Sequence, residues 1–278
     1  MFIRRLESVN AFLAVDLADA PGTGVARLAP KILQGGAKDL ARSMTYALAS
    51  LERRETGISA GINAGPDNRA GAVVAFADEV AGWEAHFRLT PGRGIEAGEL
   101  DSLGIPLEDD LVAVSAVAAA MASMPGATTA SVMGGDVALN AQLASANLTV
   151  IDTDDPVVVA CDLLFCGSKV GAIDHLAAAR LGCSVVVPTG PLPLTARAVA
   201  VCRQRGITAL PDFITTCGPL VADSEGVADS EGVAATAASI VAEVLDHPDG
   251  VFLGACERAE SFLAGWQDHL PFGRPMAP

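Results

Sequence analysis

The chain has few of the residues on which most catalytic and metal sites depend. Of its 278 residues only 4% are aromatic and 18% are charged, and there are three lysines and four histidines. The histidines are scattered without the spacing of metal ligands, and no two of the six cysteines form a C-x-x-C pair. We therefore predict no metal site, and we interpret the cysteines as reduced thiols of the core.

The sequence also lacks long apolar runs and an excess of positive charge. No apolar run is long enough to cross a membrane, and residues 1–10 contain no apolar stretch of the kind found in signal peptides. The formal net charge is −15, which repels phosphate backbones and anionic lipid. These absences predict a cytoplasmic protein with neither a nucleic acid nor a membrane as partner.

What the sequence does have is small apolar residues. Hydrophobic residues make up 51% of the chain, and alanine, glycine and valine dominate. Such residues suit the close packing of helices on sheets, and the length allows two domains of ordinary size. The composition therefore predicts an α/β protein with a substantial core.

The pattern along the chain changes near residue 125. Before it, apolar periodicity and turn residues predict strands at 11–16, 24–28 and 56–64, helices at 33–51, 69–83 and 110–124, and a loop at 90–94. After it, short apolar strands at 128–133, 148–152, 162–165, 184–187 and 208–211 alternate with helices at 136–146, 171–181 and 195–205. This alternation predicts a parallel sheet covered on both faces.

Two features of this second part are unusual. The stretch between Asp152 and Asp162 is too short for a helical crossover, which indicates a trimmed nucleotide-binding domain. Residues 221–226 repeat at 227–232, which we interpret as a duplicated acidic loop, and helices are expected at 233–245 and 251–266.

A candidate dinucleotide fingerprint follows the strand at 128–133. The segment Met133-Gly134-Gly135-Asp136-Val137-Ala138 lies before a predicted helix, and Asp152 ends the next strand. Glycine allows the backbone to approach a pyrophosphate, and an acidic residue at the second strand end can bind ribose hydroxyls. Met133 replaces the first glycine of the pattern, so a structural turn stays an alternative.

Several further motifs occur in the order of one family. They are Ala41 to Tyr46, Gly57 to Ile62, Gly24 with Arg27, Asp162 to Ile173, Gly190-Pro191, Thr195-Ala196, Arg205-Gly206-Ile207, Pro211-Asp212 and Gly218. Together they resemble the glutamate, leucine, phenylalanine and valine dehydrogenases, with leucine dehydrogenase similar in layout. The resemblance covers about two thirds of the chain. It implies an N-terminal α/β dehydrogenase-type domain, a trimmed Rossmann-like parallel-sheet domain, and NAD or NADP as cofactor.

The chain departs from this family where the family keeps its catalytic groups. One family lysine holds the substrate carboxylate, a second polarises the carbonyl, and an aspartate moves protons. The matching positions here are Ala47, Ser59 and Gly92. Because Lys31, Lys38 and Lys169 lie elsewhere, the catalytic residues stay unassigned. Arg53, Arg54 and Arg93 could bind a carboxylate, but surface positions are favoured, and arginine cannot replace an acid–base lysine.

These observations lead to one set of predictions. We expect a substrate and oligomerisation domain at 1–108, a dinucleotide-binding domain at 109–232, and C-terminal helices at 233–278 that pack back toward the first domain. The cofactor-binding candidates are Gly134, Gly135, Asp136, Asp152, Ser168, Lys169 and Thr189. For Lys169 a solvated loop position is the alternative.

The predicted function is that of an NAD(P)-dependent oxidoreductase, similar to amino-acid dehydrogenases, with divergent or lost catalytic residues. Its small ligand is expected in an interdomain cleft, and by resemblance the chain is expected to form a homo-oligomer. The alternatives are a silent relative that senses a nucleotide or other ligand, and a structural partner of an active paralogue.

Overall fold

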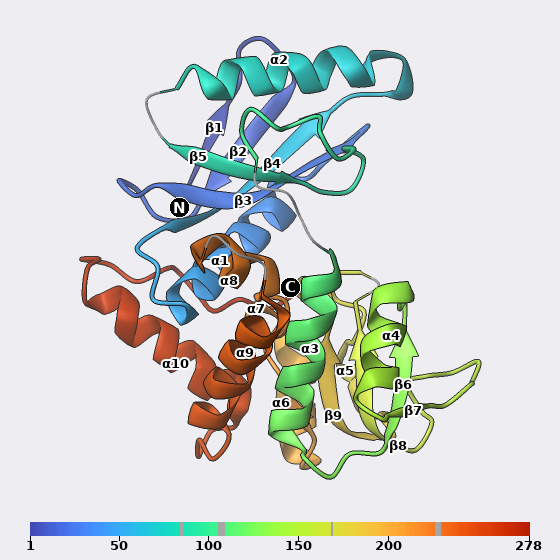
Figure 1. The fold of residues 1–278 in the computed structure, drawn as a ribbon. Coiled ribbons are helices and arrows are strands. Elements are labelled where there is room, and N and C mark those ends of the chain that lie inside the picture. Colours follow the sequence, from blue (N-terminus) through green and yellow to red (C-terminus); the bar gives the residue numbers. More distant parts are fainter. Residues whose placement is uncertain (84–85, 105–108, 168, 226–228) are drawn as a thin grey trace. The chain divides into compact units, whose positions relative to one another are not determined.

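The computed structural model describes residues 1–83, 86–104, 109–167, 169–225 and 229–278, and the chain divides into two compact units. Unit 1 consists of Met1–Leu107 with Phe262–Pro275, and unit 2 of Glu108–Ser261 with Met276–Pro278. Each unit contains one five-stranded sheet (Figure 1). The predicted α/β class with parallel strands is confirmed.

The sheet of unit 1 is mixed and has the order β1-β2-β4-β3-β5. Strands β3 and β4 are parallel to each other, as are β3 and β5, whereas β2 is antiparallel to both β1 and β4. The bounds are β1 Phe2–Arg5, β2 Ala11–Val15, β3 Gly22–Ala29, β4 Thr56–Asn63 and β5 Phe87–Pro91. The sequence does not predict β1, and it wrongly assigns residues 90 and 91 to a loop.

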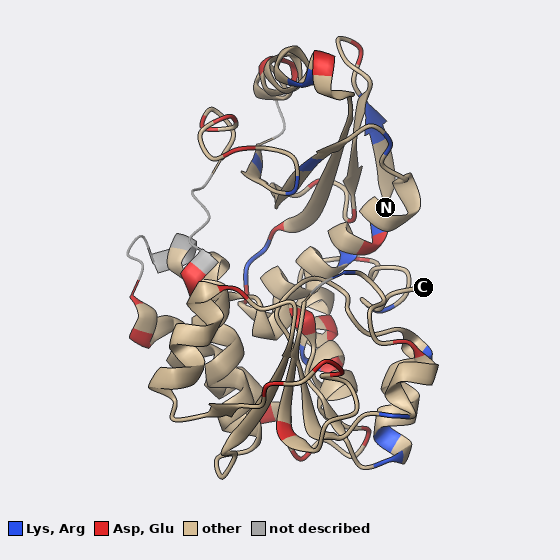
Figure 2. Cartoon of the chain, turned by 90° about the vertical axis from the view of Figure 1, so that its right-hand side faces the viewer, with Lys and Arg blue, Asp and Glu red and all other residues tan. Residues whose placement is uncertain are grey.

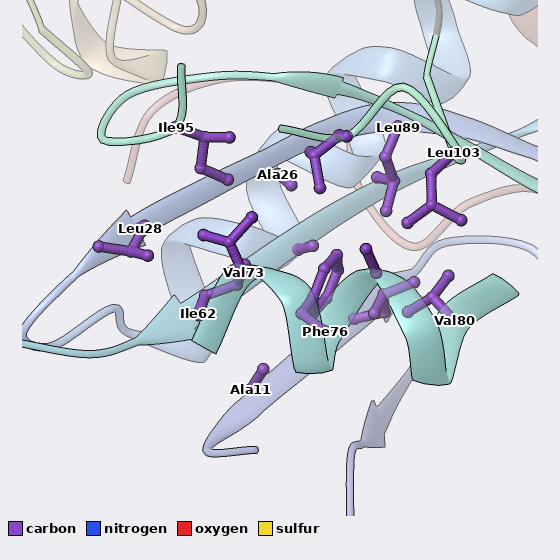
Figure 3. Close-up of a cluster of buried hydrophobic side chains, with 14 of the residues drawn as sticks. Ala11, Ala26, Leu28, Ile62, Val73, Phe76, Val80, Leu89, Ile95 and Leu103 are labelled. Atoms are coloured by element: carbon purple, nitrogen blue, oxygen red, sulfur yellow. The ribbon is translucent and has the colours of Figure 1, made fainter. Parts of the chain in front are cut away.

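Two helices serve this sheet in different ways. Helix α2 (Arg69–Ala81) presents Val73, Phe76 and Val80 to an apolar cluster that includes Ile62 and Leu89 (Figure 3). Helix α1 (Gln34–Ser50) contacts β4 and β2, where Ala37 and Ala41 pack with Phe12 and Ala14. The alternation along the strands thus divides their side chains between the two faces. A short 3-10 turn, Pro66–Asn68, precedes α2.

The sheet of unit 2 is parallel throughout, with the order β10-β9-β8-β6-β7. Its strands are β6 Thr129–Met133, β7 Thr149–Val150, β8 Cys161–Cys166, β9 Cys183–Pro188 and β10 Thr208–Ala209. The chain runs from β6 out to β7 and returns to place β8 on the other side of β6. Parallel sheets bind ligands beside the strand ends where the order reverses in this way, here between β6 and β8.

The helices of unit 2 pack on this sheet or on one another, and the last of them runs on into unit 1 at Phe262. They are α3 Asp109–Ser123, α4 Val137–Ser145, α5 His175–Ala178, α6 Ala196–Gln204, α7 Asp212–Thr215, α8 Gly218–Glu225, α9 Ser230–Val244 and α10 Val251–Ala264. On one face, Ala198 and Cys202 of α6 pack with Leu164 and Val186. Elsewhere α3 contacts β9 and packs along α9.

The expected trimming of this domain is confirmed. No helix lies between β7 and β8. The connection is held by the Ser131 hydroxyl, which donates to the Pro156 carbonyl over 2.9 Å, and by the Gly182 N–H, which donates to the Val157 carbonyl. Gly182 is required, since a Cβ there would lie 2.4 Å from the Val159 carbonyl oxygen.

Two predictions about local structure in unit 2 are wrong. The helix expected at 171–181 is reduced to the four residues of α5, because Ile173 forms a parallel bridge with Leu194 and Asp174 then starts the helix as its N-cap. The repeat expected to be a loop is partly helical: α8 continues to Glu225, and α9 begins at Ser230 with Asp229 as N-cap. The repeat residues 226–228 lie outside the described residues.

Candidate functional site

The first candidate region is the part of the unit 1 sheet beside α1. Helix α1 packs closely on β4 because Gly57 has no side chain, since a Cβ there would lie 2.0 Å from the Ala41 carbonyl oxygen. On the neighbouring strand β3, Val25 and Arg27 are only half-buried, as is Thr90 on β5. On the side of the sheet that carries α1, this strip of β3 and β5 is therefore accessible to solvent.

Neither position that matches a family lysine carries a charge. Ser59 is buried on β4, where it pairs with Val25 in the parallel register. Ala47 is buried on α1. The polar partner that the structure gives Ser59 is Arg27, whose Nη2 donates to the serine Oγ over 3.4 Å. A guanidinium therefore lies next to the position where the resemblance implies an amine.

Arg27 is the functional candidate that the sequence analysis missed, because it was noted only as part of the framework. Its Nε is buried and makes no hydrogen bond. Burial lowers the pKa of Arg27, yet arginine stays protonated near neutral pH, so this group can bind an anion but cannot take up or release a proton. The sequence signal that could have identified Arg27 is that it is the one charged residue in the predicted strand at 24–28.

The position that matches the family aspartate has no room for a side chain. A Cβ on Gly92 would lie 2.5 Å from Val25 Cγ1 and 2.9 Å from the Ala26 carbonyl oxygen. Arg93, the next residue, is exposed. The close packing of this loop on β3 therefore excludes an aspartate at Gly92 in the observed backbone conformation.

The other arginines considered from the sequence differ in their surroundings. Arg53 donates from both Nε and Nη2 to Glu55 Oε1, over 2.8 and 2.6 Å, so its charge is engaged within the protein. The Glu55 carboxylate also accepts from Arg88 over 3.1 Å. Burial acts to raise the pKa of Glu55, but hydrogen bonds from Thr23 and Arg53 and the charges of Arg53 and Arg88 together lower it. Arg54 is exposed.

Unit 1 also buries a carboxylate. Asp16 follows β2 with its side chain 0% exposed, and the closest cationic atom is Arg42 Nη2 at 3.8 Å. The Thr45 hydroxyl donates to the Ala41 carbonyl, so its proton is committed elsewhere, and neither Asp16 oxygen has a hydrogen-bond partner. Burial raises the pKa of Asp16, an effect that the charge of Arg42 only partly offsets.

The second candidate region is the carboxyl edge of the unit 2 sheet. Gly134 follows β6 with φ +77°, a conformation that favours glycine. Gly135 comes close to its own strand, since a Cβ there would lie 2.5 Å from Val132 Cγ1. Asp136 is the N-cap of α4, where its Oδ1 accepts from the Leu139 N–H over 2.8 Å. All three predicted residues are exposed at the start of the helix.

The ends of the neighbouring strands contribute to the same edge. The Gly167 N–H donates to the Met133 carbonyl, and the Thr189 N–H donates to the Cys166 carbonyl over 2.8 Å. A Cβ on Gly167 would lie 2.4 Å from Thr189 Oγ1, so these two residues touch. Asp152 is exposed two residues beyond β7.

The two remaining cofactor candidates lie in the loop after β8. Ser168 lies outside the described residues. Lys169 is exposed, as a solvated loop lysine would be.

Two features of this edge would suit a nicotinamide dinucleotide, and one opposes it. The Asp136 side chain satisfies only the Leu139 N–H, which leaves other N–H groups of the first turn of α4 available for a pyrophosphate. Asp152 follows the strand whose end meets the ribose in such domains. The Asp136 carboxylate opposes the fit because it brings negative charge next to the expected phosphate position.

Metal and thiol chemistry find no support in the described part of the chain. No group of three or more histidine, cysteine, aspartate or glutamate side chains there could hold a metal ion. The six cysteines are free thiols, five of them buried. Burial raises the pKa of Cys202 to about 11 and that of Cys217 to about 12, so these thiols stay protonated at neutral pH. Five of the six cysteines therefore lie in the core, as the sequence predicts.

Among the described residues no helix is both long and apolar enough to span a bilayer. Comparison with known sequences finds no matching family model and no matching curated protein.

Comparison with solved structures finds extensive similarity at low identity. L-tryptophan dehydrogenase from Nostoc punctiforme is 18% identical with a TM-score of 0.74, and the match covers 95% of this chain and 96% of that one. The hetero-hexameric glutamate dehydrogenase of Thermus thermophilus is 17% identical with a TM-score of 0.77, over 95% and 86%. Plasmodium falciparum glutamate dehydrogenase is 14% identical with a TM-score of 0.72, over 92% and 79%. The chain therefore has the fold of the amino-acid dehydrogenases.

Proposed function

We propose that this protein is a dinucleotide-binding relative of the amino-acid dehydrogenases that does not catalyse lysine-dependent oxidative deamination. In this proposal unit 2 binds NAD or NADP and unit 1 binds a small acid. The protein then acts as a sensor of these ligands rather than as a deaminating enzyme.

The observation that carries the proposal is the contact between Arg27 and Ser59. Deamination needs a group that changes its protonation state during the reaction. Ser59 stands where the resemblance implies such an amine, and its charged neighbour is an arginine at 3.4 Å. Removing groups that stabilise charge in a transition state typically lowers rates by about 100-fold or more for each group.

The retained features of unit 2 support dinucleotide binding. The pyrophosphate would lie against Gly134, Gly135 and the first turn of α4, and Asp152 would accept hydrogen bonds from a ribose. Ser168, Lys169 and Thr189 are proposed to lie near the nicotinamide end of the ligand. When bound, a nicotinamide would supply a hydride donor or acceptor.

The same features support a second candidate function. A protein that keeps the nucleotide-binding edge can transfer hydride to or from a substrate that needs no acid–base amine. In this second candidate the protein is still an oxidoreductase, but its substrate is not an amino acid. It predicts turnover with some carbonyl or hydroxyl compound but not with amino acids.

A third candidate is a structural partner within a mixed assembly. The Thermus thermophilus neighbour is described as hetero-hexameric, so chains of this fold assemble with unlike subunits there. A subunit without catalytic lysines could support such an assembly, or form a homo-oligomer. Co-purification with a lysine-containing dehydrogenase, together with a defined mass, would favour this candidate.

The proposal is tested by two measurements on the purified full chain. NADH and NADPH are titrated by nicotinamide fluorescence, and NAD(P)-dependent turnover is measured with panels of amino acids, keto acids and 2-hydroxy acids. We expect saturable binding of at least one dinucleotide and no turnover with amino or keto acids. Amino-acid-dependent reduction of NAD or NADP would overturn the proposal, as would the absence of binding at millimolar dinucleotide.

A further inference from the structure

A cationic pocket lies beside the carboxyl end of β3 in unit 1. Its volume is about 410 Å³, and its walls include the side chains of Arg27, Lys31 and Arg93. Ile32 and Leu33 supply apolar surface, and Gly36 of α1 leaves space because nothing lies within 4 Å of where its Cβ would be. None of the residues that line the pocket is acidic.

The three cations differ in their partners from several other arginines of unit 1. Arg53, Arg69 and Arg88 each form a salt bridge with a glutamate. Among the described residues, no carboxylate lies within salt-bridge distance of Arg27, Lys31 or Arg93, although the chain has a net charge of −15 and acidic residues occur throughout both units (Figure 2). Lys31 and Arg93 are exposed, whereas Arg27 is partly buried, and a partly buried cation without an anion carries a desolvation cost that a bound anion would offset.

The geometry of Arg27 links this pocket to the strand position discussed above. Its Nη2 contacts Ser59 and its Nε is buried away from solvent, so a ligand in the pocket would meet the outer end of the guanidinium, formed by Nη1 and Nη2. Arginine binds carboxylates through two parallel hydrogen bonds, so a guanidinium with unused donors favours a planar carboxylate.

The first turn of α1 adds to the positive character of the pocket. Leu33 at the N-cap makes no side-chain cap, and no acidic residue lies in the first turn. The backbone N–H groups there are thus left to solvent or to a ligand. The loop before the helix is held because the Ile32 N–H donates to Asn63 Oδ1 over 2.6 Å.

We propose that this pocket binds a small organic carboxylate with an aliphatic tail, its carboxylate held by Arg27, Lys31 and Arg93 and its tail resting on Ile32 and Leu33. This assignment builds on the proposed function in one respect, since it names the class of acid that unit 1 takes. It does not depend on dinucleotide binding or on the absence of turnover.

The test uses a pair of probes that differ only in charge. The full chain is titrated calorimetrically with 4-methylpentanoate and with 4-methylpentanamide, and separately with inorganic phosphate. We expect the carboxylate to bind at least about tenfold more tightly than the amide, because the amide has no charge to pair with three cations. Equal binding of carboxylate and amide would overturn the proposal, and tighter binding of phosphate would overturn the choice of an organic acid.

Two variants with matched controls assign the site. Lys31→Gln and Arg93→Gln alter exposed side chains, so both variants should fold, and each should weaken carboxylate binding about fivefold or more. Lys38→Gln and Arg54→Gln remove the same charge from exposed positions outside the pocket and should leave binding within about twofold. Equal losses in both pairs would contradict the assignment.

The dinucleotide titration is repeated on Lys31→Gln and Arg93→Gln. Unchanged NADH binding in these variants separates a failure of the pocket from a failure of the proposed function. A parallel loss of both ligands would overturn the pocket assignment.

Discussion

The two candidate regions of this molecule differ in what builds them. The carboxyl edge of unit 2 is formed mostly by backbone, with glycines at 134, 135 and 167 and the first turn of α4. The candidate region of unit 1 depends on side-chain charge, and its positions that match family catalytic groups hold Ala47 on α1, Ser59 on β4 and Gly92 after β5. A site made of backbone tolerates changes of side chain, whereas acid–base chemistry is removed by a few substitutions.

The two regions also differ in how closely their glycines are packed, and this difference predicts the largest change in the free energy of unfolding. In unit 1 the Gly57→Ala substitution would place a Cβ 2.0 Å from the Ala41 carbonyl and 2.4 Å from the Thr45 nitrogen, both of them backbone atoms of α1. Because a helix cannot yield as a side chain can, we expect a loss of about 3 kcal/mol in urea unfolding. Gly65→Ala, where nothing lies within 4 Å, should cost less than about 0.5 kcal/mol.

A glycine of unit 2, Gly135, provides a second control for the Gly57→Ala variant. A Cβ on Gly135 meets the end of the Val132 side chain rather than backbone, so Gly135→Ala should cost less than Gly57→Ala. If the two variants unfold at the same urea concentration, the close packing of α1 on β4 is not what Gly57 provides.

The second prediction concerns the buried carboxylate of unit 1. Asp16 has no hydrogen-bond partner, and burial raises its pKa above the ordinary 3.8. The folded state therefore binds a proton more tightly than the unfolded state, and stability falls as the pH rises from 3.8 through the raised pKa. Asp16→Asn should thus stabilise the protein at neutral pH by about 1 to 2 kcal/mol.

Calorimetric melting across pH tests this sign. The gain from Asp16→Asn should grow as the pH rises above the ordinary carboxylate pKa and should disappear below it, where Asp16 is protonated in both states. The exposed Asp78→Asn serves as control and should leave the melting temperature nearly unchanged. Destabilisation of the Asn variant at neutral pH would mean that Arg42 pairs with Asp16 more strongly than their 3.8 Å separation indicates.

The smallest expected effect lies at the unit 2 edge. Asp136→Asn keeps the side-chain oxygen that accepts from Leu139 but removes the negative charge beside the proposed pyrophosphate position. NADH should then bind about fivefold more tightly, a gain of roughly 1 kcal/mol. Asp174→Asn, at the N-cap of α5, makes the same change of net charge away from the fingerprint and should alter the affinity less than about twofold.

This result would also bear on the comparison between the two regions. If Asp136→Asn binds NADH no better than the unaltered protein, then the charge of the cap does not limit binding, and the dinucleotide is not seated at α4.

Much of the fold could be predicted from local sequence, but the edges of the sheets could not. The strand at 128–133 matches β6 closely, because a continuous apolar run between turns is a strong signal. Strand β1 is short and contains Arg4 and Arg5, and β5 ends in Pro91, so neither has the pattern of a buried strand. Both are edge strands, where charge and proline are tolerated and tertiary pairing decides the conformation.

The candidate site was predictable only where it follows from chain order. Gly134, Gly135 and Asp136 lie at the start of α4 because a strand and a helix flank them in sequence. The contact of Arg27 with Ser59 joins two strands that are 32 residues apart and depends on the β3–β4 register, which no local pattern reveals. The pocket of Arg27, Lys31 and Arg93 likewise needs the pairing of β3 with β5.

The most direct test of the account is a single-turnover experiment with protein in excess of NAD or NADP. Leucine, glutamate and tryptophan are added in turn, and nicotinamide absorbance is followed while a parallel calorimetric titration reports whether the oxidised dinucleotide is bound. With no amine at Ser59 or Ala47, we expect a bound dinucleotide that is not reduced, at neutral pH and at about pH 10, where a lysine of ordinary pKa would begin to lose its proton. Stoichiometric reduction with any of these amino acids would contradict the account.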